Sequence, residues 1–239
     1  MEPIFLKAAW KNLIMANYAV EPSILLPFLP AHTELDFWNG QCYISLVGFM
    51  FLNTRVLGIS IPFHRNFEEV NLRFYVRCKD GDEWKRGVVF IKEIVPKWAI
   101  SLVANTFYGE KYIALPMQNT LENQRDGSLS VSYGWEMGGA WDELKVETLP
   151  YASELAPGSE EEFITQHYWG YTKLKGDRTS EYQVEHPSWK VYQVKDYYIN
   201  VSGERLYGKE FGEILKGKPD SVFMAEGSEI LVRKGKMIS

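Results

Sequence analysis

The sequence predicts a single, mainly antiparallel β domain: an α+β fold in which a closed or nearly closed β barrel carries a few peripheral helices. Three dipeptides, Asn39-Gly40, Asp80-Gly81 and Asp126-Gly127, each separate runs rich in β-branched and aromatic residues, which is typical of tight hairpins. The regular strand–helix alternation of a doubly wound sheet is absent. Closing the sheet removes exposed strand edges, and 239 residues without a repeat or a long linker suit one domain over residues 1–239.

The strands are placed by these turns and by a further turn at Gly176-Asp177. The N-terminal segment Phe5–Tyr18 fits a helix or a strand, and its pattern leaves both open. Elsewhere the expected strands are Val70–Cys78, Trp84–Val95, Lys111–Glu122, Ser128–Met137, Tyr168–Lys175, Ser180–Glu185 and Trp189–Val201.

Helical segments are fewer, and their ends carry the clearest signals. Pro96 precedes one segment and Gly109 follows it, which is the arrangement of proline and glycine that marks helix ends. Ser159 and Glu162 form a capping box, in which each side chain accepts a backbone N–H at the start of a helix. The expected helical segments are 21–29, 98–107, 160–167 and 204–215.

Composition and charge exclude several classes of function. The formal net charge is −5 and no Lys/Arg cluster is present, so nucleic acid and acidic membranes are not expected partners, because binding phosphates requires a basic patch. The longest apolar run, Tyr43–Leu52, is about half of the ~20 residues that a membrane helix needs. The N-terminus, with Glu2 and Pro3, lacks the apolar core of a signal peptide, so a cytoplasmic protein is expected. Cys42 and Cys78 are expected to be reduced structural thiols.

Motifs for a metal, a cofactor or a standard nucleophile are absent from the sequence. Its four histidines stand without the spacing of metal ligands. It contains no Gly-x-Ser-x-Gly nucleophile elbow, no phosphate-binding glycine loop and no dinucleotide fingerprint. Hydrolase, kinase and dehydrogenase functions therefore lack support, and neither a metal nor a cofactor is expected.

The clearest candidate site is the alternating strand Glu69–Val76. Glu69, Asn71, Arg73 and Tyr75 share one face, and the other face is apolar throughout. Two interpretations stay open: the polar face meets solvent on a half-buried strand, or it lines a cavity inside a barrel. In a cavity, Arg73 can bind a ligand carboxylate through two hydrogen bonds while Glu69 and Asn71 orient it. If Glu69 and Arg73 are buried together, their pairing is a structural alternative.

Lys92 is a second candidate, on the neighbouring strand Gly87–Val95. Strict alternation places Lys92 on one face with Val88, Phe90 and Ile94. An amine in such apolar surroundings can lose its proton and act as a nucleophile, whereas an ordinary lysine extends its ammonium group to the rim.

Segments spread over most of the chain carry a family resemblance: Leu26–Pro30, Glu69–Val76, Gly87–Phe90, Glu161–Tyr168 and His186–Trp189. Their order and spacing resemble the YqjF-like family of uncharacterised proteins, which is grouped with the acetoacetate decarboxylase-like superfamily. The resemblance implies a closed, cone-like antiparallel barrel with a few helices and a central cavity.

The same resemblance bears on Schiff-base chemistry. The decarboxylases of the superfamily use two lysines in a motif that reads roughly Tyr-Gly-x-Pro-Lys-Lys. In the matching stretch here, Lys111 takes the proline position, and Tyr112 and Ile113 take the lysine positions. A shift of one residue turns a strand side chain to the other face, so Lys111 is expected to point away from the cavity unless a bulge intervenes. Glu69 matches a glutamate of the decarboxylases.

The leading hypothesis is a barrel that binds a small, partly apolar or carboxylate-bearing molecule without Schiff-base chemistry. One alternative is an enzyme, a lyase or decarboxylase-like protein, that acts on a small keto acid through Lys92 or Lys111. A second alternative is a non-catalytic scaffold that assembles as a homo-oligomer. Its 15% aromatic content would then serve packing and subunit contacts. The residues expected to line the ligand site are Glu69, Asn71, Arg73, Tyr112, Phe90 and Trp98.

Overall fold

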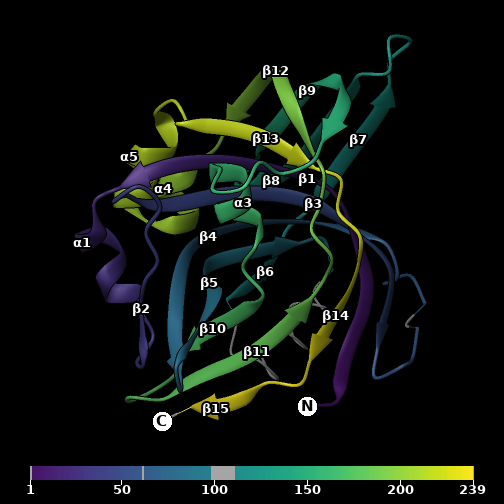
Figure 1. Ribbon diagram of the computed structural model, residues 1–239. Coiled ribbons are helices and arrows are strands. Elements are labelled where there is room, and N and C mark those ends of the chain that lie inside the picture. Colours follow the sequence, from purple (N-terminus) through teal and green to yellow (C-terminus); the bar gives the residue numbers. More distant parts are fainter. Residues whose placement is uncertain (1, 61, 98–110, 239) are drawn as a thin grey trace.

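The computed structural model describes residues 2–60, 62–97 and 111–238, and strands dominate these ranges (Figure 1). The strands are β1 (Ile4–Val20), β2 (Thr33–Leu35), β3 (Cys42–Val56), β4 (Phe67–Asp80), β5 (Glu83–Val95), β6 (Tyr112–Ala114), β7 (Met117–Asn123), β8 (Leu129–Met137), β9 (Ala140–Ser153), β10 (Trp169–Lys173), β11 (Thr179–Glu185), β12 (Val191–Asn200), β13 (Ser221–Ala225), β14 (Glu229–Arg233) and β15 (Lys236–Ile238). The helices are α1 (Pro22–Leu25), the 3-10 turn η1 (Leu26–Phe28), α3 (Glu160–Thr165), α4 (Gly203–Tyr207) and α5 (Lys209–Lys216).

Seven strands close into a ring. The order of neighbours is β1, β3, β4, β5, β10, β11 and β14, and β14 pairs again with β1. Six of these seven pairings are antiparallel, and the pairing of β5 with β10 is parallel. Because an odd number of strands cannot alternate in direction all the way around a ring, such a parallel pair is required. The closed barrel expected from the sequence is confirmed, and β10, β11 and β14 form its near wall in Figure 1.

The other long strands extend the sheet beyond the ring. From β1 the order continues through β13, β12, β9, β8 and β7. As a result β3 and β4 are covered on both faces. Val47 and Tyr75 belong to the core inside the ring, whereas Leu46 and Phe74 pack outside it with Phe211 of α5. Strands covered on both faces carry apolar residues on both, as these two do.

The expected hairpins are present, except that the turn at Asn39-Gly40 closes only the isolated bridge Trp38↔Gln41, because β2 pairs with β4 and not with β3. Asn39 and Gly40 have φ angles of 49° and 78°, which a tight two-residue turn requires. The pairs β4–β5, β7–β8 and β10–β11 are antiparallel neighbours. The single strand expected over 111–122 is wrong. Its first part is β6, which pairs in parallel with β5, and Pro116, which has no N–H to donate, separates β6 from β7.

The helices and the N-terminal segment match the sequence in part. The segment 5–18 lies within strand β1, and the turn over 21–29 forms α1 and η1. The Ser159 hydroxyl accepts the Glu162 N–H at 3.2 Å, but the Glu162 carboxylate accepts from the N–H of Gly158 rather than Ser159. The helix expected over 204–215 is two helices, because Gly208 between them has a φ of 94°. The helix expected over 98–107 lies outside the described residues.

Two further expectations concern the membrane and the cysteines. Within the described ranges, every helix is too short or too polar to cross a membrane. Cys42 and Cys78 are free and buried, on β3 and β4. Burial raises the pKa of the Cys42 thiol to about 11, so it remains protonated at neutral pH. Both cysteines therefore behave as small apolar core residues.

Candidate functional site

The ring encloses a cavity of about 190 Å³. Every ring strand contributes to its wall, which places the cavity inside the barrel. His167, just after α3, is a buried residue of the wall. Ile59, in the β3–β4 loop, is 68% exposed and marks the mouth of the cavity. Most of the wall is apolar and aromatic, and it includes Phe5, Trp10, Phe49, Phe51, Phe67 and Phe90.

Strand β4 supplies three polar residues of this wall. Glu69, Asn71 and Arg73 line the cavity, while Leu72 and Phe74 between and beyond them belong to the core outside the ring. Glu69 is only 2% exposed and Asn71 only 1%, so the polar face does not meet bulk solvent. The alternation of the sequence is thus retained along β4 without a bulge against β3. Whether these side chains hold a ligand stays a prediction.

Strand β5 departs from strict alternation, and this corrects the placement of Lys92. The pairing shifts between Leu72↔Lys92 and Arg73↔Phe90, which leaves Ile91 as the extra residue of a β-bulge. Ile91 and Lys92 therefore both lie outside the ring, and Lys92 Nζ donates to the Leu206 carbonyl of α4. The expectation that Lys92 shares a face with Phe90 is wrong, because the bulge brings Glu93 into the cavity in its place.

Two carboxyl groups and one phenol meet in the wall. The Tyr112 hydroxyl donates to Glu69 Oε2 at 3.0 Å and is also hydrogen-bonded to Glu93. Asn71 Nδ2 donates to Glu69 Oε1 at 3.0 Å. Burial, followed by the charges of Glu69 and Glu93, raises the pKa of Tyr112 well above its usual range. Tyr112 therefore stays a neutral phenol at the position where the decarboxylase motif has a lysine.

Arg73 is placed differently from these carboxyls. Its guanidinium donates one hydrogen bond, to the Ile164 carbonyl at 3.4 Å, and lies 5.6 Å from the centre of the Tyr75 ring. Among the described residues it forms no ion pair, and its buried Nε has no hydrogen-bond partner. The ion pair between Glu69 and Arg73, which the sequence left open as a structural alternative, therefore does not form. Within the described part of the chain, most of the hydrogen-bond donors of the Arg73 guanidinium have no partner.

His167 is a wall residue that the sequence did not single out as a site residue. Its Nε2 lies 3.1 Å from Asp36 Oδ2, which also accepts from Arg86 Nε at 2.7 Å. Burial lowers the pKa of His167 to about 4, so its ring is neutral at neutral pH. Burial alone would raise the pKa of Asp36, but hydrogen bonds from His167 and Arg86 outweigh this and hold it below its usual value. Local sequence carries no signal for this contact, because Asp36 and His167 are 131 positions apart.

The other predicted site residues are placed as follows. Phe90 and Tyr112 line the cavity, and Trp98 lies outside the described residues. Lys111 Nζ lies 5.4 Å from the centre of the Phe28 ring, which packs with the core outside the ring. No lysine is among the described wall residues, and residues 98–110 contain none. No group of three or more His, Cys, Asp or Glu side chains in the described ranges is arranged to hold a metal ion.

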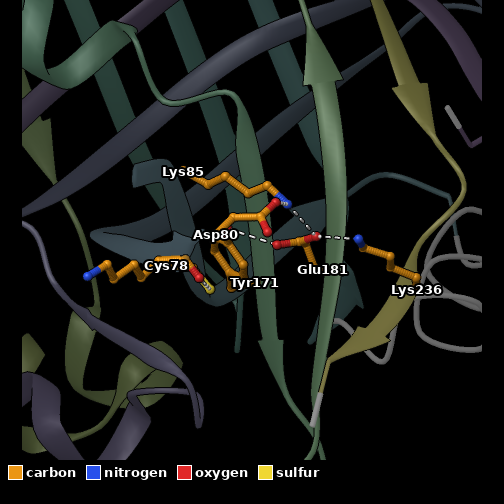
Figure 2. Close-up of polar contacts among 7 residues, drawn as sticks. Cys78, Asp80, Lys85, Tyr171, Glu181 and Lys236 are labelled. Atoms are coloured by element: carbon orange, nitrogen blue, oxygen red, sulfur yellow. Dashed lines mark hydrogen bonds and ion pairs between the residues drawn. The ribbon is translucent and has the colours of Figure 1, made fainter. Parts of the chain in front are cut away.

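A second buried polar cluster lies where β10, β11 and β15 meet the β4–β5 hairpin (Figure 2). Glu181, which is 2% exposed, accepts from Lys85 and from Lys236, each at 3.3 Å, and from the Tyr171 hydroxyl at 3.1 Å. Lys85 also pairs with Asp80 at 2.6 Å. Glu181 thus joins the C-terminal strand β15 to the ring.

Comparison with solved structures defines the class of fold. The chain is similar to acetoacetate decarboxylase from Legionella pneumophila subsp. pneumophila str. Philadelphia 1, with a TM-score of 0.66 and 11% identity over 99% of this chain and 88% of that one. It is similar to an acetoacetate decarboxylase-like enzyme from Sphingomonas wittichii RW1, with a TM-score of 0.66 and 11% identity over 98% and 93%. It is also similar to the enduracididine biosynthesis enzyme MppR complexed with pyruvate, with a TM-score of 0.68 and 12% identity over 100% and 92%. The ring is therefore a cone-like barrel of the acetoacetate decarboxylase-like fold.

The family follows from the sequence comparison. The DUF2071 family, described as an uncharacterized conserved protein, matches residues 7–229, and the chain belongs to this family. Over 115 residues it is 34% identical to the uncharacterized protein YqjF of Bacillus subtilis (strain 168). That match covers 48% of this chain and 46% of YqjF, so it spans about half the length of that relative. The resemblance drawn from the sequence is confirmed for family and for fold.

Proposed function

We propose that this protein binds a small monocarboxylate with an apolar body inside the barrel, without forming a Schiff base. The observation that carries the proposal is the guanidinium of Arg73, which reaches the cavity with no ion pair to any described residue. Arg73 is half-buried, and a positive charge that is partly removed from water without a counter-ion is unfavourable, a cost that a bound carboxylate relieves. The planar guanidinium matches a carboxylate through two parallel hydrogen bonds.

The apolar wall is matched to the rest of such a ligand. Phe49, Phe51 and Phe67 line the cavity and belong to the same inner core. Phe67 precedes Glu69 on β4, and Phe51 and Phe49 pair with these two residues from β3. A ligand whose carboxylate binds Arg73 can extend its hydrocarbon part along this aromatic wall toward the mouth. Aromatic and aliphatic lining with few polar groups is the usual construction of small-molecule sites.

The two buried carboxyl groups limit where the anion can bind. Glu69 and Glu93 share hydrogen bonds with Tyr112, and an added anion next to them would be repelled. Arg73 lies two and four residues further along β4 than Asn71 and Glu69, on the same face. We therefore place the ligand carboxylate at Arg73 and not at Tyr112.

A structural neighbour gives separate support. MppR, which shares this fold at 12% identity, has a structure in complex with pyruvate, a small carboxylate. In the present chain the wall contains no described lysine, so a bound keto acid has no amine with which to form an imine. Incubation with pyruvate and borohydride, followed by mass spectrometry of the intact protein, is expected to give no covalent adduct.

The binding proposal is tested by calorimetric titration with 4-methylpentanoate and with the uncharged 4-methylpentan-1-ol. The acid is expected to bind, and the alcohol at least about tenfold more weakly, because a charge-assisted hydrogen bond contributes ~1.5–3 kcal/mol. Arg73→Met should reduce the affinity for the acid by a similar factor. The matched control is Arg77→Met, because Arg77 lies on the same strand but pairs with Glu34 outside the cavity wall. Equal affinity of the Arg73→Met variant and the unmodified protein for the acid contradicts the proposal.

A further inference from the structure

Besides Trp10 Nε1 on β1 and Thr54 Oγ1 on β3, three buried polar atoms of the cavity wall have no hydrogen-bond partner among the described residues: Asn71 Oδ1, Arg73 Nε and His167 Nδ1. Buried polar atoms in native proteins are nearly always paired, so three of them around one cavity require an explanation. Their chemistry is not uniform, because Arg73 Nε donates a hydrogen bond whereas the other two atoms can be assigned as acceptors.

The assignment of the two acceptors follows from their neighbours. Asn71 Nδ2 donates to the Glu69 carboxyl at 3.0 Å, which leaves the amide oxygen directed elsewhere. His167 Nε2 lies 3.1 Å from the Asp36 carboxylate, which can only accept, so Nε2 carries the proton. With the ring neutral at neutral pH, Nδ1 then presents a lone pair. Both atoms can therefore accept a hydrogen bond from a ligand.

These acceptors lie beside the proposed carboxylate position. Asn71 is two residues from Arg73 on the same face of β4. The Tyr75 ring lies 5.6 Å from the Arg73 guanidinium and 4.7 Å from the His167 ring, and Arg73 bonds Ile164 of α3, three residues before His167. A carboxylate held by Arg73 therefore has acceptors around the carbon next to it.

Resting on the proposed function, we infer that the ligand is a 2-hydroxy acid, whose hydroxyl donates to His167 Nδ1 or Asn71 Oδ1 while its carboxylate binds Arg73. A 2-oxo acid offers only acceptors there, and its carbonyl oxygen would face the lone pairs of these two atoms. An unsubstituted acid leaves both acceptors unpaired and buried. A 2-amino acid would bring an ammonium group next to Arg73, with Arg86 beyond Asp36, and is disfavoured by charge repulsion.

The test on the unmodified protein compares acids that share one hydrocarbon tail. Calorimetric titrations at neutral pH use each enantiomer of 2-hydroxy-4-methylpentanoate, then 4-methyl-2-oxopentanoate, 4-methylpentanoate and leucine. One hydroxy enantiomer is expected to bind about tenfold more tightly than the unsubstituted acid, since leaving a buried acceptor unpaired costs ~1–3 kcal/mol. The oxo acid should bind no more tightly than the unsubstituted acid.

His167→Gln isolates the cavity acceptor. The glutamine amide can occupy the place of the Nε2–H and still donate to Asp36, but it leaves no acceptor at the position of Nδ1. This variant is expected to lose most of the tenfold preference for the hydroxy acid over 4-methylpentanoate, measured as the ratio of the two affinities in the same variant. The matched control is His186→Gln, because His186 is half-buried, stacks on Trp189 at 4.0 Å and is not in the described cavity wall.

The outcomes separate this inference from the function on which it rests. If all the acids bind equally and Arg73→Met weakens them all, carboxylate binding stands and the 2-hydroxy assignment is overturned. Tightest binding of the oxo acid or of leucine also overturns it. If none of the acids binds, the proposed function fails together with the inference. A hydroxyl preference that persists unchanged in a folded His167→Gln variant removes His167 from the site.

Discussion

The two buried polar clusters of this protein differ in whether the chain itself supplies the hydrogen-bond partners. Around Glu181, which lies outside the cavity, a carboxylate accepts from two lysines and one tyrosine (Figure 2). Inside the cavity, Arg73 has one weak hydrogen bond, and acceptors on Asn71 and His167 lack partners among the described residues. The first cluster is complete without a ligand, and the second is not.

This difference separates stability from binding within one barrel. A complete cluster leaves no buried charge uncompensated, so removing one of its members is strongly destabilising. An incomplete cluster is retained at some cost in stability, and a ligand that supplies the missing groups recovers that cost as affinity. Mutation of Glu181 should therefore lower the stability of the fold and leave ligand affinity unchanged, whereas mutation of Arg73 should lower ligand affinity and leave stability nearly unchanged.

The largest effect is expected for Glu181→Ala. Removing this carboxylate leaves the Tyr171 hydroxyl without its acceptor and leaves Lys85 with Asp80 alone, which should lower the free energy of unfolding by about 3 kcal/mol. Urea unfolding monitored by circular dichroism measures the loss, and affinity for the carboxylate ligand should not change. Lys236→Ala is the control, with a loss below about 1 kcal/mol, because that side chain is 49% exposed. Equal losses of unfolding free energy for the two variants would show that the buried Glu181 contributes no more to stability than the exposed Lys236.

The next largest effect is expected from acid. Because burial holds the pKa of folded His167 at about 4, against about 6.5 when unfolded, the unfolded chain binds a proton first as the pH falls. Stability is therefore lost between about pH 6.5 and pH 4, by up to ~3 kcal/mol from this group, and the loss ends below pH 4. Asp36, Arg86 and Arg73 are the charged groups that face it.

Urea unfolding midpoints between pH 4.5 and 7.5 test this dependence. His186, whose pKa burial also lowers to about 4, adds to the loss in the same window. His167→Gln should remove the part that belongs to His167 and leave the remainder. If the variant and the unmodified protein lose stability in parallel, the acid sensitivity does not come from His167.

The smallest effect on stability is expected for Arg73→Met without ligand. Arg73 has no ion pair to lose among the described residues, and methionine fills a similar volume without a charge. The free energy of unfolding should stay within about 1 kcal/mol of the unmodified protein or rise slightly, measured by urea unfolding. A large loss of stability in this variant would mean that Arg73 serves the fold and would erase the contrast between the clusters.

Strands β4 and β5 show how far the sequence could predict the site. Along β4 the polar and apolar residues alternate without interruption, so the common face of Glu69, Asn71 and Arg73 could be predicted correctly. Along β5 the same rule failed after Phe90, because the bulge at Ile91 has no glycine or proline to signal it. One extra residue exchanged a lysine for a glutamate in the cavity wall.

By itself the sequence determined the positions of the tight turns, the antiparallel pairing around them and the two faces of β4, because each depends on neighbouring residues and backbone geometry. Only the tertiary structure decided that the polar face of β4 meets a cavity, that Lys92 lies outside it, and that Asp36 orients His167. These features depend on ring closure, on a local shift of register and on contacts between distant segments. They arise from how the whole sheet packs, and no short stretch of sequence specifies them.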